Sequence, residues 1–414
     1  MVDQMNNSNY TKWVACWGNA TSISDREIST YSKNLTLRYP VRMCFNGSKL
    51  RFHFSNLTGT ENVKITKAFV ADVTKDDGSY KPVYIMQNGK AEIIIPKGEE
   101  VVSDEVEFEV RKGDTLTVSL YFADFTQMSA GTLVSGPLSK AQFAYGDFAD
   151  CRILPHDLSK STQWFYFLNT IDVLTEEKNH AFICYGDSIT AQSWPDYLTL
   201  RLEEEKIDNV SIIRRAVCGT RILRQYDCIT YQAYGLKGET RFPVEMNVAG
   251  ASAVLIQHGI NDIIHPVGEE VNQFRPWSDL PKAEEMAWGF ENLYVKYAKN
   301  LGLKVYGGTL LPIYGWRTYA PFRNELRNQY NDYIRNTKSI DGVVDFDKAL
   351  RNQEKPESFA EGFDSGDHLH PSEAAYKKMA EAVNLEFLKY VQLYMKVFLL
   401  EYLPFFYTEV KYET

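Results

Sequence analysis

Positive charge is the first thing that this chain has little of. Lys and Arg total 45 residues against 54 Asp and Glu, which gives a formal net charge of −9 at pH 7. Because nucleic-acid-binding domains usually present a basic face, this balance argues against a nucleic-acid partner. The chain also has neither an H-E-x-x-H zinc motif nor a G-x-x-x-x-G-K-[ST] phosphate-binding loop. The sequence therefore predicts no metal site and no cofactor.

Paired cysteines and a leader segment are also missing. None of the six cysteines belongs to a C-x-x-C pair, which removes the usual signals of a zinc ribbon or a thioredoxin-like redox site. Several cysteines lie in apolar runs, where reduced and buried thiols are expected. The first residues show no basic segment followed by an apolar stretch, which argues against a secretory signal. We therefore expect a cytoplasmic protein.

The C-terminal stretch, residues 391–414, is apolar and rich in aromatic side chains. Lys396, Glu401 and Pro404 interrupt it, so it is a poor membrane span and we expect no membrane partner. The favoured interpretation is an extension that packs on the protein's own surface. A subunit interface, which would make the protein a homo-oligomer, is the alternative. Translation beyond the natural end of the gene is a third explanation.

The length and the hydrophobic pattern predict two domains before this extension. A chain of 414 residues with 44% hydrophobic residues can build large cores. From about residue 10 to 175, short runs alternate apolar and polar side chains, as in 50–54, 91–95 and 106–110. Asn-Gly and Asp-Gly turn signals separate such runs. Residues 1–175 are therefore predicted to form an all-β accessory domain, a sandwich or jelly roll.

From about residue 179 the pattern changes to alternating strands and helices. Predicted strands cover 181–185, 210–213, 253–257, 303–310 and 343–346, and predicted helices cover 195–206, 283–300, 322–338 and 372–389. This alternation is typical of a doubly wound, flavodoxin-like α/β domain, which we place at residues 176–390. Ligands of such domains bind at the carboxyl ends of the strands.

Four short peptides in this second domain supply the parts of a serine hydrolase. They are Gly186-Asp187-Ser188-Ile189-Thr190, Ala216-Val217-Cys218-Gly219, Gly259-Ile260-Asn261-Asp262 and Asp367-His368-Leu369-His370. A serine hydroxyl needs a base, the base needs an orienting partner, and the tetrahedral intermediate needs donors for its oxyanion. Ser188 follows a predicted strand and precedes a predicted helix, so its own amide can point toward developing negative charge. Each peptide is common alone, but four in order are specific.

These peptides resemble the blocks of the SGNH hydrolases, a branch of the GDSL esterases. The resemblance covers about residues 180–390 and implies that Ser188 is the nucleophile, His370 the base and Asp367 its orienting acid. It also implies an oxyanion hole made by the amides of Ser188 and Gly219 and the side chain of Asn261. The sequences 13–17, 51–56 and 363–371 are further similar to family members that have an N-terminal β-domain. Cys218 departs from the family pattern, where a small residue is expected.

Rival assignments exist for several positions of these blocks. His368 is the rival of His370 as the base, and Asp364 is the rival of Asp367 as the orienting acid. Asp187 and Asp262 are expected to be structural, because carboxylates in such loops accept hydrogen bonds from nearby backbone amides. Trp194, Trp277 and Trp316 are candidates for the substrate-binding wall, although a tryptophan in such a position more often serves packing alone.

The resemblance implies a serine esterase that removes acetyl groups from sugars or oligosaccharides, with a small-molecule or oligosaccharide ester as its partner. A lysophospholipase or short-chain lipase is an alternative of the same class. A catalytically inactive carbohydrate-binding protein is an alternative of another class, against which the complete set of Ser188, Asp367 and His370 counts.

Overall fold

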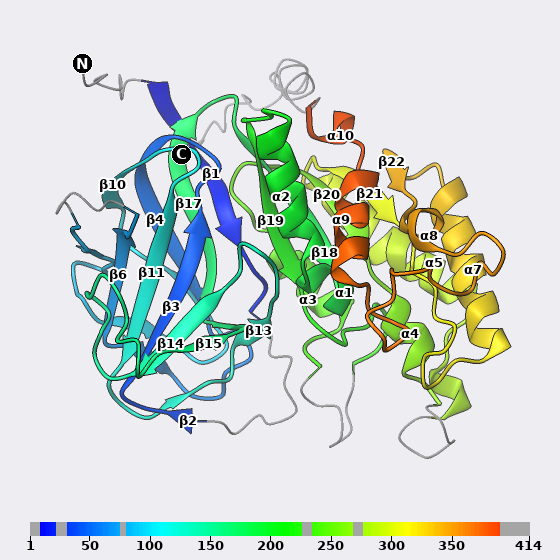
Figure 1. The fold of residues 1–414 in the computed structure, drawn as a ribbon, viewed down its shortest axis with the longest axis horizontal. Helices are drawn as coiled ribbons and strands as arrows, with labels where there is room; N and C mark the ends of the chain where they lie inside the picture. The colour runs from blue at the N-terminus through cyan, green and yellow to red at the C-terminus, as the bar shows by residue number, and fades with distance from the viewer. Residues whose placement is uncertain (1–8, 22–30, 75–79, 226–233, 268–275, 390–414) are drawn as a thin grey trace, which may run out of the picture.

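The computed structural model describes residues 9–21, 31–74, 80–225, 234–267 and 276–389. Two regions lie side by side in it (Figure 1). Antiparallel strands build the first region, and the second is a parallel sheet with helices packed against it. The last antiparallel strand ends at Glu176 and the first parallel strand begins at His180. The predicted fold classes of both regions are confirmed, and residues 391–414 lie outside the described part.

Two main antiparallel sheets form the first region, in the orders β1-β17-β4-β10, with β9 also on β4, and β15-β14-β3-β11-β6-β7. Their apolar side chains join one buried core, to which Phe52 and Val118 belong. The strands are β1 (Tyr10–Gly18), β3 (Leu35–Arg42), β4 (Gly47–Ser55), β6 (Lys67–Asp72), β7 (Val83–Tyr84), β9 (Glu100–Val102), β10 (Val106–Val110), β11 (Thr115–Phe122), β14 (Ala141–Tyr145), β15 (Lys160–Thr162) and β17 (Leu168–Glu176).

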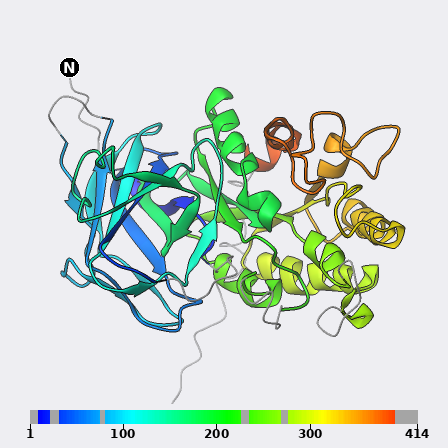
Figure 2. The ribbon, with the colours of Figure 1, turned by 60° about the horizontal axis from the view of Figure 1, so that its bottom comes forward.

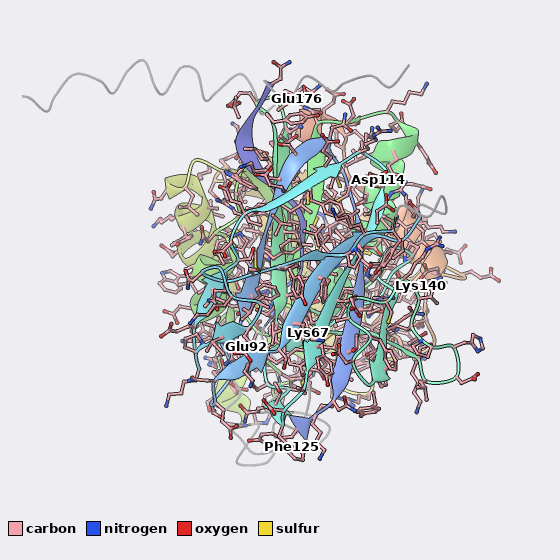
Figure 3. The ribbon with its side chains drawn as sticks, turned by 90° about the vertical axis from the view of Figure 1, so that its left-hand side faces the viewer. Lys67, Glu92, Asp114, Phe125, Lys140 and Glu176 are labelled. Carbon is pink, nitrogen blue, oxygen red and sulfur yellow. The ribbon has the colours of Figure 1, made fainter. Side chains whose placement is uncertain are left out.

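Three small two-stranded ladders complete this region. They pair β2 (Tyr31–Ser32) with β12 (Thr126–Gln127), β5 (Val63–Ile65) with β8 (Ile93–Ile95), and β13 (Gly131–Leu133) with β16 (Trp164–Tyr166). The surface turned away from the helices carries charged side chains such as Lys67, Glu92 and Asp114, together with the exposed ring of Phe125 (Figure 3).

The parallel sheet has the strand order β19-β18-β20-β21-β22. Numbered within the sheet this is 2-1-3-4-5, the order of flavodoxin-like folds. The strands are β18 (His180–Gly186), β19 (Val210–Ala216), β20 (Ala251–Gln257), β21 (Lys304–Gly308) and β22 (Gly342–Val344). Every residue of β18 is buried because helices cover one face of the sheet and more helices cover the other. Its sequence is therefore a nearly unbroken apolar run.

Helices lie on both faces of this sheet (Figure 2). They are α1 (Ser188–Ala191), α2 (Trp194–Glu204), α3 (Gly238–Glu245), α4 (Ile260–Ile264), α5 (Ala283–Gly289), α6 (Lys296–Asn300), α7 (Pro321–Asn336), α8 (Phe346–Leu350), α9 (Glu373–Ala382) and α10 (Glu386–Lys389), with a 3-10 turn at Trp277–Asp279. Two predicted helices differ in detail. A π-helical stretch, Phe290–Val295, separates α5 from α6, and the closing helix breaks between α9 and α10.

The two regions are joined by backbone and side-chain hydrogen bonds close to the ends of the parallel strands. Thr132 Oγ1 donates to the carbonyl of Ala216 at 3.1 Å. The amide of Ser135 donates to the carbonyl of Ala191 at 3.3 Å. At the other end of the sheet, Ser211 Oγ donates to the carbonyl of Ala15 at 2.6 Å. The antiparallel region therefore braces the segments that follow β18 and β19.

The described cysteines form no disulfide. Cys16, Cys44, Cys151, Cys184 and Cys218 are free thiols. Among the described residues, no helix is both long enough and apolar enough to cross a membrane. Cys228 lies outside the described residues.

Candidate active site

Ser188 lies at the carboxyl end of β18, where the strand turns directly into α1. Gly186 ends the strand, and a Cβ there would meet Thr190 Oγ1 at 2.4 Å and the carbonyl of Gln257 at 2.6 Å, so the turn requires glycine. Asp187 caps the helix by accepting a hydrogen bond from the amide of Ile189 at 3.1 Å. Because α1 is a single turn, it contributes free backbone amides rather than the dipole of a long helix.

A continuous line of hydrogen bonds joins Ser188, His370 and Asp367. Ser188 Oγ lies 2.8 Å from His370 Nε2, although the two residues are 182 positions apart. His370 Nδ1 lies 2.6 Å from Asp367 Oδ2. Because an ionised carboxylate only accepts hydrogen bonds, Nδ1 carries the proton and Nε2 is free to accept the serine proton. The geometry is that of a nucleophile, a base and an orienting acid.

The two carboxyl groups nearest to this line differ in protonation. Burial pushes the pKa of Asp367 upward, but hydrogen bonds from the ring and amide of His370 and from the amide of Leu369 outweigh it and hold the pKa well below its usual range. Burial raises the pKa of Asp187 to about 7, and the amide of Ile189 offsets only part of that shift. Asp367 is therefore the ionised partner of the imidazole, and Asp187 is a helix cap.

The rival residues form a second pair in the same loop. His368 Nδ1 contacts Asp364 Oδ2, and the amide of His368 donates to Asp364 Oδ1 at 3.0 Å. His368 has a positive φ of 65°, a left-handed conformation that is uncommon for a residue other than glycine. Asp364 thus orients His368, whereas His370 is the histidine that reaches Ser188.

Gly219 and Asn261, two of the predicted oxyanion-hole residues, belong to neighbouring segments that hydrogen bonds hold together. Asn261 is 2% exposed, and its Nδ2 donates to the carbonyl of Thr220, next to Gly219, at 3.1 Å. Gly219 has a φ of +75°, and a Cβ there would meet the ring of Tyr234 at 2.5 Å. Asp262 accepts bonds from the amides of Ile222 and Leu223 at 2.7 and 3.2 Å, which is the structural role expected of it.

Two histidines near these loops were not singled out in the sequence. His258 Nε2 lies 3.0 Å from the carbonyl of Thr220, and its Nδ1 lies 2.8 Å from the hydroxyl of Tyr294. His265 Nε2 lies 2.8 Å from Asn261 Oδ1. Of the two, only His265 has a signal in the sequence. It lies four residues after Asn261, and residues four apart in a helix face the same side.

Comparison with protein families places this site in a known group. Residues 184–378 match the model of the GDSL-like lipase/acylhydrolase family. This part of the chain is a GDSL-like acylhydrolase domain. It contains all four peptides, so the chain carries a hydrolase domain that acts on esters.

Solved structures that resemble the chain include three with low identity. An acetyl xylan esterase, AlAXEase, is 21% identical, with a TM-score of 0.35 over 49% of this chain and 96% of that one. Axe2, an acetylxylan esterase from Geobacillus stearothermophilus, is 17% identical, with a TM-score of 0.36 over 50% and 94%. A putative GDSL-like lipase from Bacteroides ovatus is 13% identical, with a TM-score of 0.33 over 86% of each chain. A search of the curated proteins finds no match.

The three tryptophans proposed for the substrate wall of the acylhydrolase domain differ in position. Trp194 is fully buried against Phe346, with ring centroids 5.5 Å apart, so the prediction that it contacts substrate is wrong. It lies in the first turn of α2, the turn that packs into the core. Trp277 is 54% exposed and packs on Phe322 at 5.3 Å.

Trp316 is half-buried beside the loop that carries the base of the acylhydrolase domain. The residue before it, Gly315, approaches His368 so closely that a Cβ would meet the imidazole at 2.8 Å. Arg317 lies over the Trp316 ring, 4.8 Å from its centroid. Trp316 and Trp277 therefore remain candidates for the wall.

In the described part of the chain, no group of three or more His, Cys, Asp and Glu side chains could hold a metal ion.

Proposed function

We propose that the acylhydrolase domain hydrolyses small acyl esters, above all acetyl esters of sugars or oligosaccharides, through an acyl-enzyme on Ser188. The observation that carries the proposal is the pair of contacts Ser188 Oγ–His370 Nε2 and His370 Nδ1–Asp367 Oδ2, at 2.8 and 2.6 Å. A serine that faces a correctly protonated imidazole is an activated nucleophile.

The chemistry follows from these contacts. Ser188 Oγ attacks the ester carbonyl while its proton moves to His370 Nε2, and Asp367 stabilises the imidazolium. The oxyanion faces the amides of Ser188 and Gly219 and the Asn261 side chain. Collapse breaks the bond to the alcohol, which takes the proton from His370. A water molecule then gives one proton to His370 and attacks the acyl-enzyme; the bond to Ser188 Oγ breaks, Oγ takes the proton back from His370, and the acid is released.

The character of the surroundings favours a short acyl group on a polar alcohol. The loop 312–320 mixes Trp316 with Arg317, which suits the alternating apolar and polar surface of a sugar. Arg323, in the first turn of α7 after this loop, is buried and donates to the carbonyls of Ile263 and Pro266, so it ties α7 to α4 and the residues that follow it. A tunnel for a long acyl chain would need a continuous apolar lining instead.

A lysophospholipase or short-chain lipase is the second candidate, and one observation favours it. Trp277 and Phe322 form a pair that is 54% and 40% exposed, beside the Arg323 anchor to α4. An exposed apolar pair of this kind can contact a lipid chain.

A substrate panel separates these candidates. We would measure kcat/KM for acetate, butyrate, octanoate and palmitate esters of one alcohol, and acetate release from acetylated xylo- and manno-oligosaccharides. The proposal expects acetate to be preferred and oligosaccharides to be deacetylated, with Ser188→Ala inactive on both. A steady rise with chain length would favour the lipase, since each buried methylene adds about 0.8 kcal/mol of binding. Wild-type activity in Ser188→Ala would refute the site itself.

A further inference from the structure

We infer that His265 is a positioning residue for the oxyanion hole: it holds the Asn261 amide so that one N–H faces the reacting carbonyl oxygen. The inference rests on the proposed function and adds a residue to its site. His265 is 9% exposed and ends α4, the short helix that begins with Ile260 and Asn261.

The orientation of the Asn261 amide follows from its neighbours. The carbonyl of Thr220 can only accept a hydrogen bond, so the Asn261 atom that faces it at 3.1 Å is the nitrogen, Nδ2. The amide oxygen, Oδ1, then faces His265 Nε2 at 2.8 Å. Because Oδ1 only accepts, His265 carries its proton on Nε2. One N–H of Asn261 is used by Thr220, and the other is left for an oxyanion.

A second contact connects His265 to Gly219, another predicted donor. The ring of Tyr234 packs on the ring of His265, with centroids 5.3 Å apart and planes at 57°. The same Tyr234 ring lies against Gly219, where a Cβ would meet it at 2.5 Å. His265 therefore contacts Asn261 by a hydrogen bond and reaches Gly219 through one aromatic ring. Two of the three predicted donors share this support.

This arrangement matters for the rate because an oxyanion hole must be rigid before the charge develops. Removing one such donor typically lowers kcat by about 10²–10³-fold. Releasing the Asn261 amide from His265 lets it rotate without removing it, so the loss should be smaller, about 10–100-fold in kcat. KM should change little, because the interaction forms with the transition state rather than with the bound ester.

Three substitutions at position 265 test this geometry. In His265→Gln the side-chain amide nitrogen reaches about the position of Nε2 and can still donate to Asn261. In His265→Asn the amide lies near the position of Nδ1, and His265→Phe has no donor. With p-nitrophenyl acetate as the probe, we expect kcat to fall about 10–100-fold in His265→Asn and His265→Phe. In His265→Gln, kcat should return most of the way to the wild-type value. Equal kcat values for Gln and Asn would overturn the inference, and their comparison stands even if His265→Phe does not fold.

A double-mutant comparison separates positioning from general packing. If His265 acts through Asn261, then adding His265→Asn to Asn261→Ala should lower kcat by less than about threefold. A further 10-fold loss in that background would overturn the inference. His180→Phe is the matched control, since His180 is also a buried histidine, paired with Ser252 Oγ at 2.9 Å, and lies at the start of β18. Its kcat should equal that of wild type.

The same set of variants distinguishes a failed inference from a failed function. If Ser188→Ala and Asn261→Ala lose activity while His265→Asn keeps wild-type kcat, only the role of His265 is wrong. If Ser188→Ala keeps its activity, the proposed site is wrong and His265 loses its role with it.

Discussion

The antiparallel strand β10 exposes Glu107 and Glu109 between its buried ends, whereas the parallel strand β18 buries all seven of its residues. The residues of the proposed site also belong to only one of the two regions. Ser188, Gly219, Asn261 and His370 all lie in segments of the acylhydrolase domain, and the first three lie two to four residues after the ends of β18, β19 and β20. The antiparallel region reaches these segments through Thr132 and Ser135. Under the proposed function, the parallel region provides the chemistry, and the antiparallel region holds the segments that carry it.

One buried aspartate from each region shows how its neighbours decide its protonation. Asp172, in β17 of the antiparallel region, is bonded by Arg51 at 2.7 Å and His53 at 2.8 Å. Burial pushes its pKa upward, but these two partners outweigh burial and lower it. Asp187, beside the nucleophile, has no described cation in contact, and its pKa is raised to about 7 by burial. Asp172 is thus kept ionised by its partners, whereas the pKa of Asp187 is governed by burial.

The largest expected effect concerns the two histidines of the last motif. His370→Ala should lower kcat on an acetate ester by about 10⁴-fold or more, because Ser188 loses its base. His368→Ala, the matched control, should lose less than about 10-fold, because His368 is bonded to Asp364 and not to Ser188. Steady-state kinetics on both purified variants makes the comparison. The opposite ranking would move the base to His368.

Substitution of the two aspartates in this loop should lower kcat unequally, with the larger loss at Asp367, the partner of His370. Asp367→Asn should lower kcat by about 10²–10⁴-fold, because an amide partner favours the wrong imidazole tautomer. Asp364→Asn should have a much smaller effect, since Asp364 orients His368. Because the pKa of Asp367 is well below its usual range, wild-type activity should not titrate with this carboxylate above pH 4. Equal losses in the two variants would show that the loop, not the carboxylate, matters.

The buried aspartates should give stability profiles of opposite slope. Burial raises the pKa of Asp187 in the folded state to about 7, whereas the pKa in the unfolded chain is near 3.9. Between these values the folded state keeps a proton that the unfolded state has lost. The free energy of unfolding therefore falls as pH rises from about 4 to 7. Asp187→Asn should remove this loss, which is on the order of a few kcal/mol. The lowered pKa of Asp172 stabilises the fold above about pH 4, and this contribution is lost as pH falls further.

Urea unfolding from pH 4 to 7 measures the Asp187 effect as the difference between variant and wild type. Asp262 and Glu245 also have pKa values raised by burial, so the wild-type slope contains their contributions and only the difference isolates Asp187. A constant difference across this range would show that Asp187 stays ionised in the fold.

The smallest expected effect concerns the hydrogen bond from Thr132 to Ala216, which joins the antiparallel region to the parallel one. Thr132→Val removes the bond to the carbonyl of Ala216 and leaves that carbonyl buried, at a cost of about 1–3 kcal/mol of unfolding free energy. Because Ala216 precedes the loop of Gly219, kcat should fall by only about 2–5-fold. Thr11→Val, at an exposed position of β1 in the same antiparallel region, is the control. An unchanged stability in Thr132→Val would mean that the regions do not depend on this contact.

The sequence predicts the parallel sheet well because its strands are continuous apolar runs, and it predicts the four motifs because each is local. It does not reveal α3, where Pro243 lies inside the helix, or the π-helical stretch that brings Tyr294 to His258. Trp194 was misassigned because proximity to Ser188 in sequence says nothing about which face of α2 packs inward. The role of His265 depends on Thr220, which fixes the Asn261 amide from another loop.

The central claim is that Ser188 forms a covalent acyl-enzyme, and it can be tested by rapid quenching and mass spectrometry. Wild-type protein mixed with p-nitrophenyl acetate and quenched in acid should carry one added acetyl group, and peptide sequencing should place it on Ser188. Ser188→Ala should carry none under the same conditions. Turnover with no adduct at any quench time in wild type, or an acetyl group on another residue that forms and decays at the turnover rate, would contradict the account.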